Sequence, residues 1–134
     1  PLATFSPAGV DALVLPGGFG AAKNLCSYAW DGPNCTVQPD VARAIQAVHQ
    51  AGKPIGALCI APVIVARVLG NGQDQATAQN LLAMGAKNQP TGYGEIAVDR
   101  ANKIVSTPCY MLDSRIDQVA DGIDRLIGAL LEMM

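Results

Sequence analysis

A cysteine stands at the junction between two apolar segments of different character. Cys59 follows the strand-like run 55–58 and precedes residues 60–66, which favour a helix. A side chain at such a turn projects from the end of a sheet, near the unpaired N–H groups and the positive dipole end of the helix. These surroundings favour the thiolate, so Cys59 is a candidate nucleophile. A buried structural cysteine is the alternative that the local pattern leaves open.

A glycine-rich turn, Gly17-Gly18-Phe19-Gly20, ends the apolar run 11–16. Attack of a thiolate on a carbonyl places negative charge on oxygen, which backbone N–H donors already in position can stabilise. Glycine permits the backbone angles that turn an N–H outward, so this loop can supply one donor and Ile60 another. Alternatively the glycines only make a tight turn, because isolated glycine motifs are weak signals.

The first half of the chain alternates between strand-like and helix-like patterns. The apolar run 11–16 predicts a central parallel strand, followed by a short helix at 21–29 and a loop at 30–34. Residues 39–51 have the period of an amphipathic helix, with a buried face expected at Val41, Ala44, Ile45 and Val48 and a polar face at Arg43, Gln46 and Gln50. The strand at 55–58 then leads to Cys59.

The second half predicts a helix at 60–69 and another at 75–84, capped by Asp74 and ended by Gly85. Two alternating runs, 95–99 and 103–107, predict a hairpin. A final helix from Asp113, with Asp113 or Ser114 as its N-cap, has an expected core stripe of Ile116, Val119, Ala120, Ile123, Ile127, Leu130 and Met134. This order predicts an α/β fold with a mostly parallel sheet, helices on both faces and the site at the carboxyl ends of the strands.

Composition and charge restrict the class of partner. The 134 residues suffice for one domain, and 50% hydrophobic with 15% charged residues is typical of a globular protein. A net charge of −2 without a basic run argues against nucleic acid and anionic lipid as partners. The longest apolar stretch, 55–69, is too short for a membrane span and contains Pro62 and Arg67. Small molecules or proteins are the expected partners.

The four cysteines, at positions 26, 35, 59 and 109, are irregularly spaced and include no C-x-x-C pair. This spacing predicts neither a zinc site nor a disulfide scaffold, and we expect no metal and no cofactor. Cys26 and Cys35 flank a loop, where exposed or packing thiols are expected. A reducing compartment follows, with the cytoplasm as the expected location and the mitochondrial matrix as the alternative.

Five segments in order carry a family resemblance: 15–25, 49–56, 59–62, 84–87 and 102–111. Together they resemble the ElbB-like branch of the ThiJ/PfpI superfamily, which has the class I glutamine amidotransferase-like fold. The resemblance implies that residues 1–134 form a single domain of that type, a three-layer flavodoxin-like sandwich. It also implies a homodimer.

The resemblance further implies a glutathione-independent glyoxalase that converts small 2-oxoaldehydes such as glyoxal to 2-hydroxy acids through a cysteine hemithioacetal. Cys59 would be the nucleophile, and the Gly18 and Ile60 amides would form the oxyanion hole. The substrate pocket would include Gly17, Phe19, Asn24, Cys109 and Tyr110. Two alternatives use the same cysteine: a non-catalytic redox-sensing or regulatory protein, and a protein or nucleotide deglycase.

The sequence departs from the family pattern in two places. In relatives, a segment before the Pro1 position carries a Glu that pairs with the cysteine. Relatives also have a further strand where this chain has only the residues between Leu69 and Asp74. We therefore expect residues to be missing at both points. His49, the only histidine, lies before Cys59, whereas glutaminases need a His-x-Glu pair after it. Ile60 stands where PfpI peptidases have histidine. His49 is expected to face solvent and is not assigned to catalysis.

Overall fold

A four-stranded sheet forms the centre of the fold. The computed structural model describes residues 2–70 and 91–134, and its strands lie in the order β1-β2-β4-β3. Their bounds are β1 (Leu13–Leu15), β2 (Ile55–Leu58), β3 (Ala97–Asp99) and β4 (Ile104–Thr107). β1, β2 and β4 run parallel, with Leu58 opposite Thr107, and β3 runs antiparallel to β4. The prediction of a mostly parallel sheet is confirmed.

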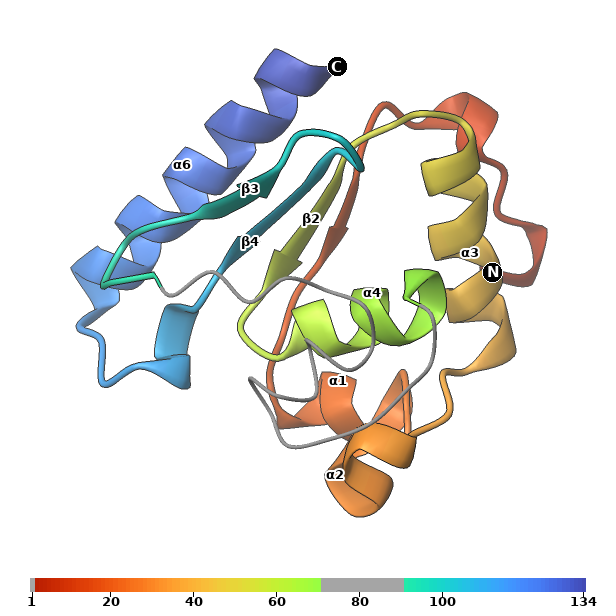
Figure 1. The fold of residues 1–134 in the computed structure, drawn as a ribbon, viewed down its shortest axis with the longest axis horizontal. Coiled ribbons are helices and arrows are strands. Elements are labelled where there is room, and N and C mark those ends of the chain that lie inside the picture. The colour runs from red at the N-terminus through yellow and green to blue at the C-terminus, as the bar shows by residue number, and fades with distance from the viewer. Residues whose placement is uncertain (1, 71–90) are drawn as a thin grey trace.

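Helices cover both faces of the sheet. They are α1 (Phe19–Asn24), α2 (Tyr28–Asp31), α3 (Pro39–Gln50), α4 (Ala61–Leu69) and α6 (Ile116–Met133), with short 3₁₀ turns η1 (Leu2–Thr4), η2 (Pro7–Gly9), η3 (Gly32–Asn34) and η4 (Cys109–Met111). α6 packs against β2 and β4 on one face, and α3 and α4 pack on the other (Figure 1). The predicted three-layer α/β arrangement is therefore confirmed.

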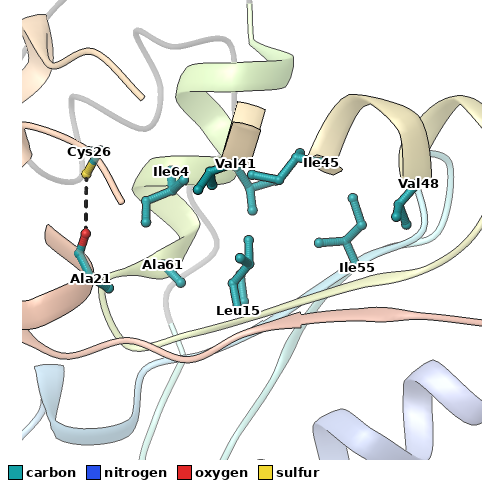
Figure 2. Close-up of a cluster of buried hydrophobic side chains, with 11 residues drawn as sticks. Leu15, Ala21, Cys26, Val41, Ile45, Val48, Ile55, Ala61 and Ile64 are labelled. Carbon is teal, nitrogen blue, oxygen red and sulfur yellow. Dashed lines mark hydrogen bonds between the residues drawn. The ribbon is translucent and has the colours of Figure 1, made fainter. Parts of the chain in front are cut away.

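A hydrophobic core fixes β2 between its neighbours. On the face that α3 and α4 cover, Ile55 of β2 and Leu15 of β1 meet Val41, Ile45 and Val48 of α3 and Ala61 and Ile64 of α4 (Figure 2). Full burial of an aliphatic side chain of this size contributes about 1.5–3 kcal/mol. Because Ile45 and Ile55 are completely buried, the end of β2 has a well-defined position, and Cys59 follows it directly.

Several predicted elements are confirmed. The helix at 39–51 is α3, and its predicted inner residues Val41, Ala44, Ile45 and Val48 are buried. Gln38 caps it, since its Oε1 accepts from Val41 N at 3.0 Å. The strand at 55–58, the helix at 60–69 and the hairpin of β3 and β4 also lie where the sequence places them.

The segment between β1 and α3 differs from the prediction. The helix expected at 21–29 is divided into α1 and α2, and the loop expected at 30–34 holds the end of α2 and the turn η3. The division occurs at Cys26, which makes an isolated bridge with Val37, while Ser27 N donates to Thr36 O at 2.9 Å. These pairings to the returning chain replace helical hydrogen bonds and are invisible to local periodicity.

The position of β1 is also a correction. The continuous apolar run predicted a central strand, yet β1 is at the edge of the described sheet, and Val14 is 39% exposed. Leu13 and Leu15 point into the core with α3 and α4, whereas Val14 faces the side of α6. An apolar run indicates that both faces of a strand are covered, but it does not indicate that the strand has a neighbouring strand on each side.

The C-terminal helix is rotated relative to the expected stripe. Val119 and Leu130 are buried as predicted, but Ile116 is 72% exposed, and Ala120, Ile127 and Met134 also face outward; the buried set is Val119, Gly122, Leu126 and Leu130. A Cβ on Gly122 would lie 2.6 Å from Thr107 Oγ1, so the glycine permits the closest approach of helix and sheet. The expected stripe was chosen from large hydrophobic residues and therefore left out Gly122, so the face that packs on the sheet differs from the predicted one.

The start of the same helix is a further correction. Arg115 rather than Asp113 or Ser114 is the N-cap, and its N–H donates to Gln118 Oε1 at 2.9 Å. Ser114 instead donates from Oγ to Cys109 O at 2.9 Å. The helix predicted at 75–84, its caps Asp74 and Gly85, the segment 84–87 and most of the expected gap between Leu69 and Asp74 lie outside the described residues. None of the described helices is both long and apolar enough to cross a bilayer.

Candidate active site

Cys59 occupies a strained turn between β2 and α4. Its φ is 57°, in the left-handed region that few residues other than glycine adopt. Such a conformation costs on the order of 1–3 kcal/mol and persists only where the surrounding structure holds it. Here Cys59 N donates to Thr107 O at 2.9 Å, which ties the turn to the end of β4. A half-buried cysteine on a sharp strand-to-helix turn has the geometry of a nucleophile.

Gly17 lies directly against this turn. A Cβ at Gly17 would be 2.5 Å from Cys59 Cβ, 2.6 Å from Leu58 O and 3.1 Å from Ile60 N. No larger residue fits without displacing backbone, so the glycine brings the end of β1 against the start of α4. The predicted site residues from the two strand ends are therefore adjacent in space.

Gly18 and Ile60 have the backbone properties that the predicted oxyanion hole requires. Gly18 has φ 89° and ψ 163°, a combination that is essentially limited to glycine. Gly18 precedes α1 and Ile60 precedes α4, so neither N–H belongs to a helical hydrogen-bond series. Within residues 2–70 and 91–134, neither N–H donates a hydrogen bond. Both amides remain available for an anionic oxygen as far as the described residues are concerned.

An open hollow of about 370 Å³ lies at the ends of these strands. We call it the Cys59 hollow; its lining residues are Gly18, Phe19, Ala22, Tyr28, Ala29, Cys59, Ile60 and Met111. The volume is within the range of small-molecule sites. Among the described lining residues none carries a charged side chain, and apart from the Tyr28 hydroxyl and the Cys59 thiol their side chains are apolar. The hollow suits a small, uncharged ligand.

The hollow includes some of the predicted site residues and excludes others. Gly18, Phe19, Cys59 and Ile60 line it. The remaining predictions lie around it: Gly17 supports the turn from behind, Asn24 is exposed at the end of α1, Cys109 is buried, and Tyr110 is 59% exposed. None of these four lines the Cys59 hollow.

Four lining residues were not predicted: Ala22, Tyr28, Ala29 and Met111. Tyr28 and Ala29 reach the hollow because the chain turns at Cys26 and begins α2 at Tyr28, which a single helix over 21–29 does not allow. Met111 belongs to a segment that the family resemblance marked, beside Cys109 and Tyr110. The family resemblance therefore indicated this segment, but it did not indicate which of the side chains faces Cys59.

Similar proteins place this geometry in a family. The chain is 42% identical over 146 aligned positions to the human glutamine amidotransferase-like class 1 domain-containing protein 3, mitochondrial, and 40% identical to the rat ES1 protein homolog, mitochondrial. Each alignment covers 98% of this chain, but only 54% and 55% of the two relatives. The chain thus spans about half the length of the curated relatives it matches. No protein-family model matches it.

Solved structures agree with these relatives. An isoprenoid biosynthesis protein with an amidotransferase-like domain from Ehrlichia chaffeensis superposes with a TM-score of 0.85 at 28% identity, over 99% of this chain and 64% of that one. This chain belongs to the ThiJ/PfpI, class I glutamine amidotransferase-like superfamily. Rapid Encystment Protein 24 kDa of Francisella tularensis shares the fold, with a TM-score of 0.61 at 17% identity over 96% of this chain and 62% of that protein.

The alignment also bears on the expected internal gap. It spans 146 positions against the 134 residues of this class I glutamine amidotransferase-like chain, so the human relative carries additional residues within the aligned region. This observation agrees with the expectation that the chain is shorter than its relatives internally.

Histidine chemistry is not part of the described site of this amidotransferase-like domain. His49 is half-buried in the last turn of α3 and does not line the Cys59 hollow. No histidine follows Cys59 in the sequence. Among the described residues, no three His, Cys, Asp or Glu side chains are grouped so that they could hold a metal ion.

The other cysteines are buried. Cys109 is 7% exposed and, like Cys59, has a left-handed backbone, with φ 48°. Burial raises the pKa of the Cys109 thiol, and the nearby Cys59 thiol raises it further, while a hydrogen bond from the Cys59 backbone lowers it. Cys26 and Cys35 are also buried, although the sequence allowed exposure. Burial is the largest cause that raises the pKa of the Cys35 thiol, followed by the adjacent Cys26.

Proposed function

We propose that the protein is a cofactor-independent glyoxalase that converts small 2-oxoaldehydes such as glyoxal to 2-hydroxy acids. The observation that carries this proposal is the Cys59 side chain in a hollow whose described lining is uncharged, beside the Gly18 and Ile60 amides, which donate no hydrogen bond to the described residues. The relatives' names support the amidotransferase-like family. The glyoxalase activity itself rests on the site and on the ElbB-like resemblance.

The reaction begins with addition of the Cys59 sulfur to one aldehyde carbon. A C–S bond forms, the carbonyl oxygen becomes negative, and the Gly18 and Ile60 amides stabilise it until it is protonated to the hemithioacetal. A proton then moves from this carbon to the neighbouring carbonyl carbon through an enediol, and the hydroxyl proton of the hemithioacetal passes to the second oxygen, which leaves a thioester of the 2-hydroxy acid. Water hydrolyses the thioester, so glyoxal plus one water gives glycolate and regenerates the thiol.

The proton transfer needs an acid/base group. None of the described residues that line the Cys59 hollow carries a carboxylate or an imidazole. The family resemblance assigns this role to a Glu in a segment preceding Pro1, and we retain that assignment. The described residues therefore supply the nucleophile and the oxyanion donors of the proposed mechanism.

Glutamine hydrolysis is less well supported. Glutamine carries an ammonium and a carboxylate, which a site recognises through opposite charges or several polar partners. The described side chains that line the hollow carry no charge, and the sequence of residues 60–134 contains no histidine. A small neutral dicarbonyl makes no such demand. Deglycation of proteins or nucleotides would use the same cysteine and remains the alternative activity.

The proposal can be tested with the full-length protein and glyoxal. We expect the wild type to form glycolate, measured by chromatography, and the Cys59→Ala variant to form none above the uncatalysed rate. A Cys35→Ala variant is the matched control because it also removes one buried thiol but lies outside the hollow, and it should retain most of the activity. Equal glycolate formation by wild type and Cys59→Ala would contradict the proposal. Stoichiometric oxidation of Cys59 without turnover would support a redox sensor instead.

We propose a mitochondrial location in place of the expected cytoplasm. The human and rat relatives both carry the word mitochondrial in their names. Fractionation of cells that express the full-length protein should recover it with matrix markers. Recovery with cytosolic markers would contradict this location.

We also propose a homodimer, as the resemblance implies. The side of α6 that faces away from the sheet exposes Ile116, Leu131 and Met134, which gives the chain an apolar surface that a second copy could cover. Sedimentation velocity of the full-length protein should give the mass of two chains. A single-chain mass at micromolar concentration would contradict the proposal.

A further inference from the structure

A second cysteine lies beside Cys59, at the end of the neighbouring strand. β2 and β4 are paired in parallel, with Leu58 opposite Thr107. A cysteine follows each of these strands: Cys59 comes directly after Leu58, and Cys109 comes after Thr107 and Pro108. Both cysteines have left-handed backbones, and Cys59 N donates to Thr107 O at 2.9 Å. The two turns are thus held together by the last hydrogen bond between the strands.

The ionisation of Cys109 agrees with this proximity. The Cys59 thiol raises the pKa of the Cys109 thiol and the Cys59 backbone lowers it, so the two residues are near each other. A disulfide needs Cα atoms about 4.4–6.8 Å apart. Cys59 N donates to Thr107 O, and Cys109 is two residues beyond Thr107, so the two cysteines occupy neighbouring turns at the same end of the sheet.

The two thiols differ in access. Cys59 is half-buried and lines the open hollow, whereas Cys109 is 7% exposed and does not line it. The Cys109 carbonyl accepts from Ser114 Oγ at 2.9 Å, which fixes its backbone. A small oxidant therefore meets Cys59 first, and Cys109 is placed to react only with what forms there.

We propose that Cys59 and Cys109 form a reversible redox pair, in which a hydroperoxide oxidises Cys59 and Cys109 resolves the product to an intramolecular disulfide. In the first step the Cys59 sulfur attacks the peroxide, an S–O bond forms, the O–O bond breaks, and water or an alcohol leaves. In the second step the Cys109 sulfur attacks the Cys59 sulfenic acid, the S–O bond breaks, and water leaves as the S–S bond forms.

Electrons balance over the two steps. The two thiols lose two electrons and two protons, and one peroxide becomes water together with water or an alcohol. A small thiol or a dithiol reductase reverses the change by exchange. Because disulfide formation competes with a second oxidation, Cys109 protects Cys59 from irreversible conversion to sulfinic acid. This pair needs only the two thiols and does not depend on glyoxalase activity.

The chain contains an internal control. Cys26 and Cys35 are also adjacent, since the Cys26 side chain hydrogen-bonds to Cys35, but they are 6% and 0% exposed. Neither lines the Cys59 hollow. Proximity alone would oxidise both pairs, whereas access through the hollow would oxidise only Cys59 and Cys109.

Peptide mapping after limited oxidation tests the proposal. The full-length protein is treated with an equimolar amount of hydrogen peroxide, free thiols are alkylated, and the digest is analysed by mass spectrometry. We expect one new disulfide, between the peptides that contain Cys59 and Cys109, while Cys26 and Cys35 are recovered as alkylated thiols. Dithiothreitol should restore all four thiols.

Variants assign the order of the two steps. In Cys109→Ala, the sulfenic acid on Cys59 should be trapped by dimedone and should be oxidised to sulfinic acid by excess peroxide. In Cys59→Ala, Cys109 should stay a thiol. Sulfinic acid on wild-type Cys59 with Cys109 still free would overturn the proposal. So would a disulfide from Cys59 to Cys26, to Cys35 or to a second chain. The wild-type map decides the matter even if a variant folds poorly, and glycolate formation by the reduced protein is measured separately.

Discussion

Replacement of Gly17 by alanine tests how the site is built. The added Cβ would lie 2.5 Å from Cys59 Cβ, 2.6 Å from Leu58 O and 3.1 Å from Ile60 N. Carbon atoms in favourable contact are separated by about 3.5–4.0 Å, so the overlap with Cys59 is about 1 Å or more. The atoms concerned belong to backbone or lie next to it, and no flexible side chain can move aside. The strand end, the turn or both must shift.

Two magnitudes follow from this overlap. Overpacking in a well-packed region costs about 1–3 kcal/mol of the free energy of unfolding. A displacement of about 1 Å at reacting groups can cost on the order of a hundredfold in rate. Because the shift falls on Cys59 and on the Ile60 amide together, we expect Gly17→Ala to lose most of its glycolate formation while it remains folded.

Urea denaturation and the glyoxal assay on the full-length protein measure the two effects. Gly128→Ala is the matched control: Gly128 lies in α6, nothing is within 4 Å of its added Cβ, and alanine should stabilise the helix by up to about 1 kcal/mol. The reasoning would be refuted if Gly17→Ala had wild-type stability and wild-type Cys59 reactivity toward iodoacetamide.

Three further predictions concern backbone strain, a hydrogen bond and pH. Gly18→Ala should cost on the order of 1–3 kcal/mol through its φ of 89° alone, since its Cβ would meet no atom within 4 Å; an unchanged urea midpoint would contradict this. Thr107→Val should cost about 0.5–1.5 kcal/mol, because the buried Thr107 donates from Oγ1 to Glu95 O at 2.9 Å in a part-buried hydrogen bond that valine cannot make; an unchanged free energy of unfolding would show that the carbonyl finds another partner. Folding raises the pKa values of the Cys35 and Cys109 thiols, so above pH ~8.5 the folded protein keeps protons that the unfolded chain releases. The free energy of unfolding should therefore fall as the pH rises above ~8.5, and it should fall less steeply in Cys109→Ala. A free energy of unfolding that did not change with pH would contradict the burial argument.

Local pattern was sufficient for the elements that carry the candidate nucleophile. The strand 55–58 is a short apolar run, the helix after it contains Pro62 in its first turn, and the helix 39–51 has a clear period. These signals depend only on residues within one or two turns of each other. They placed Cys59 at a strand end without knowledge of the rest of the chain.

Signals from distant contacts were not available in the sequence. The break between α1 and α2 depends on the bridge from Cys26 to Val37, and the rotation of α6 depends on Gly122 against Thr107. In each case a small residue or a backbone pairing decides the outcome, whereas hydrophobic periodicity weighs only large side chains. The same limitation explains why Met111 was missed as a lining residue.

The family resemblance added what local pattern could not. It named Gly18 and Ile60 together, although they are far apart in sequence, and the structure brings Gly17 to within contact distance of the turn that contains Ile60. It did not distinguish the side chains of Cys109, Tyr110 and Met111, because neighbouring residues in a 3₁₀ turn point in different directions.

Carbon-13 NMR of the full-length protein with labelled glyoxal tests whether Cys59 forms a covalent intermediate, because it observes the bond between substrate and sulfur. We expect a hemithioacetal carbon signal with wild-type protein, followed by glycolate, and neither with Cys59→Ala. Glycolate formation by Cys59→Ala at the wild-type rate, or a folded wild-type protein that yields neither signal, would contradict the proposed mechanism.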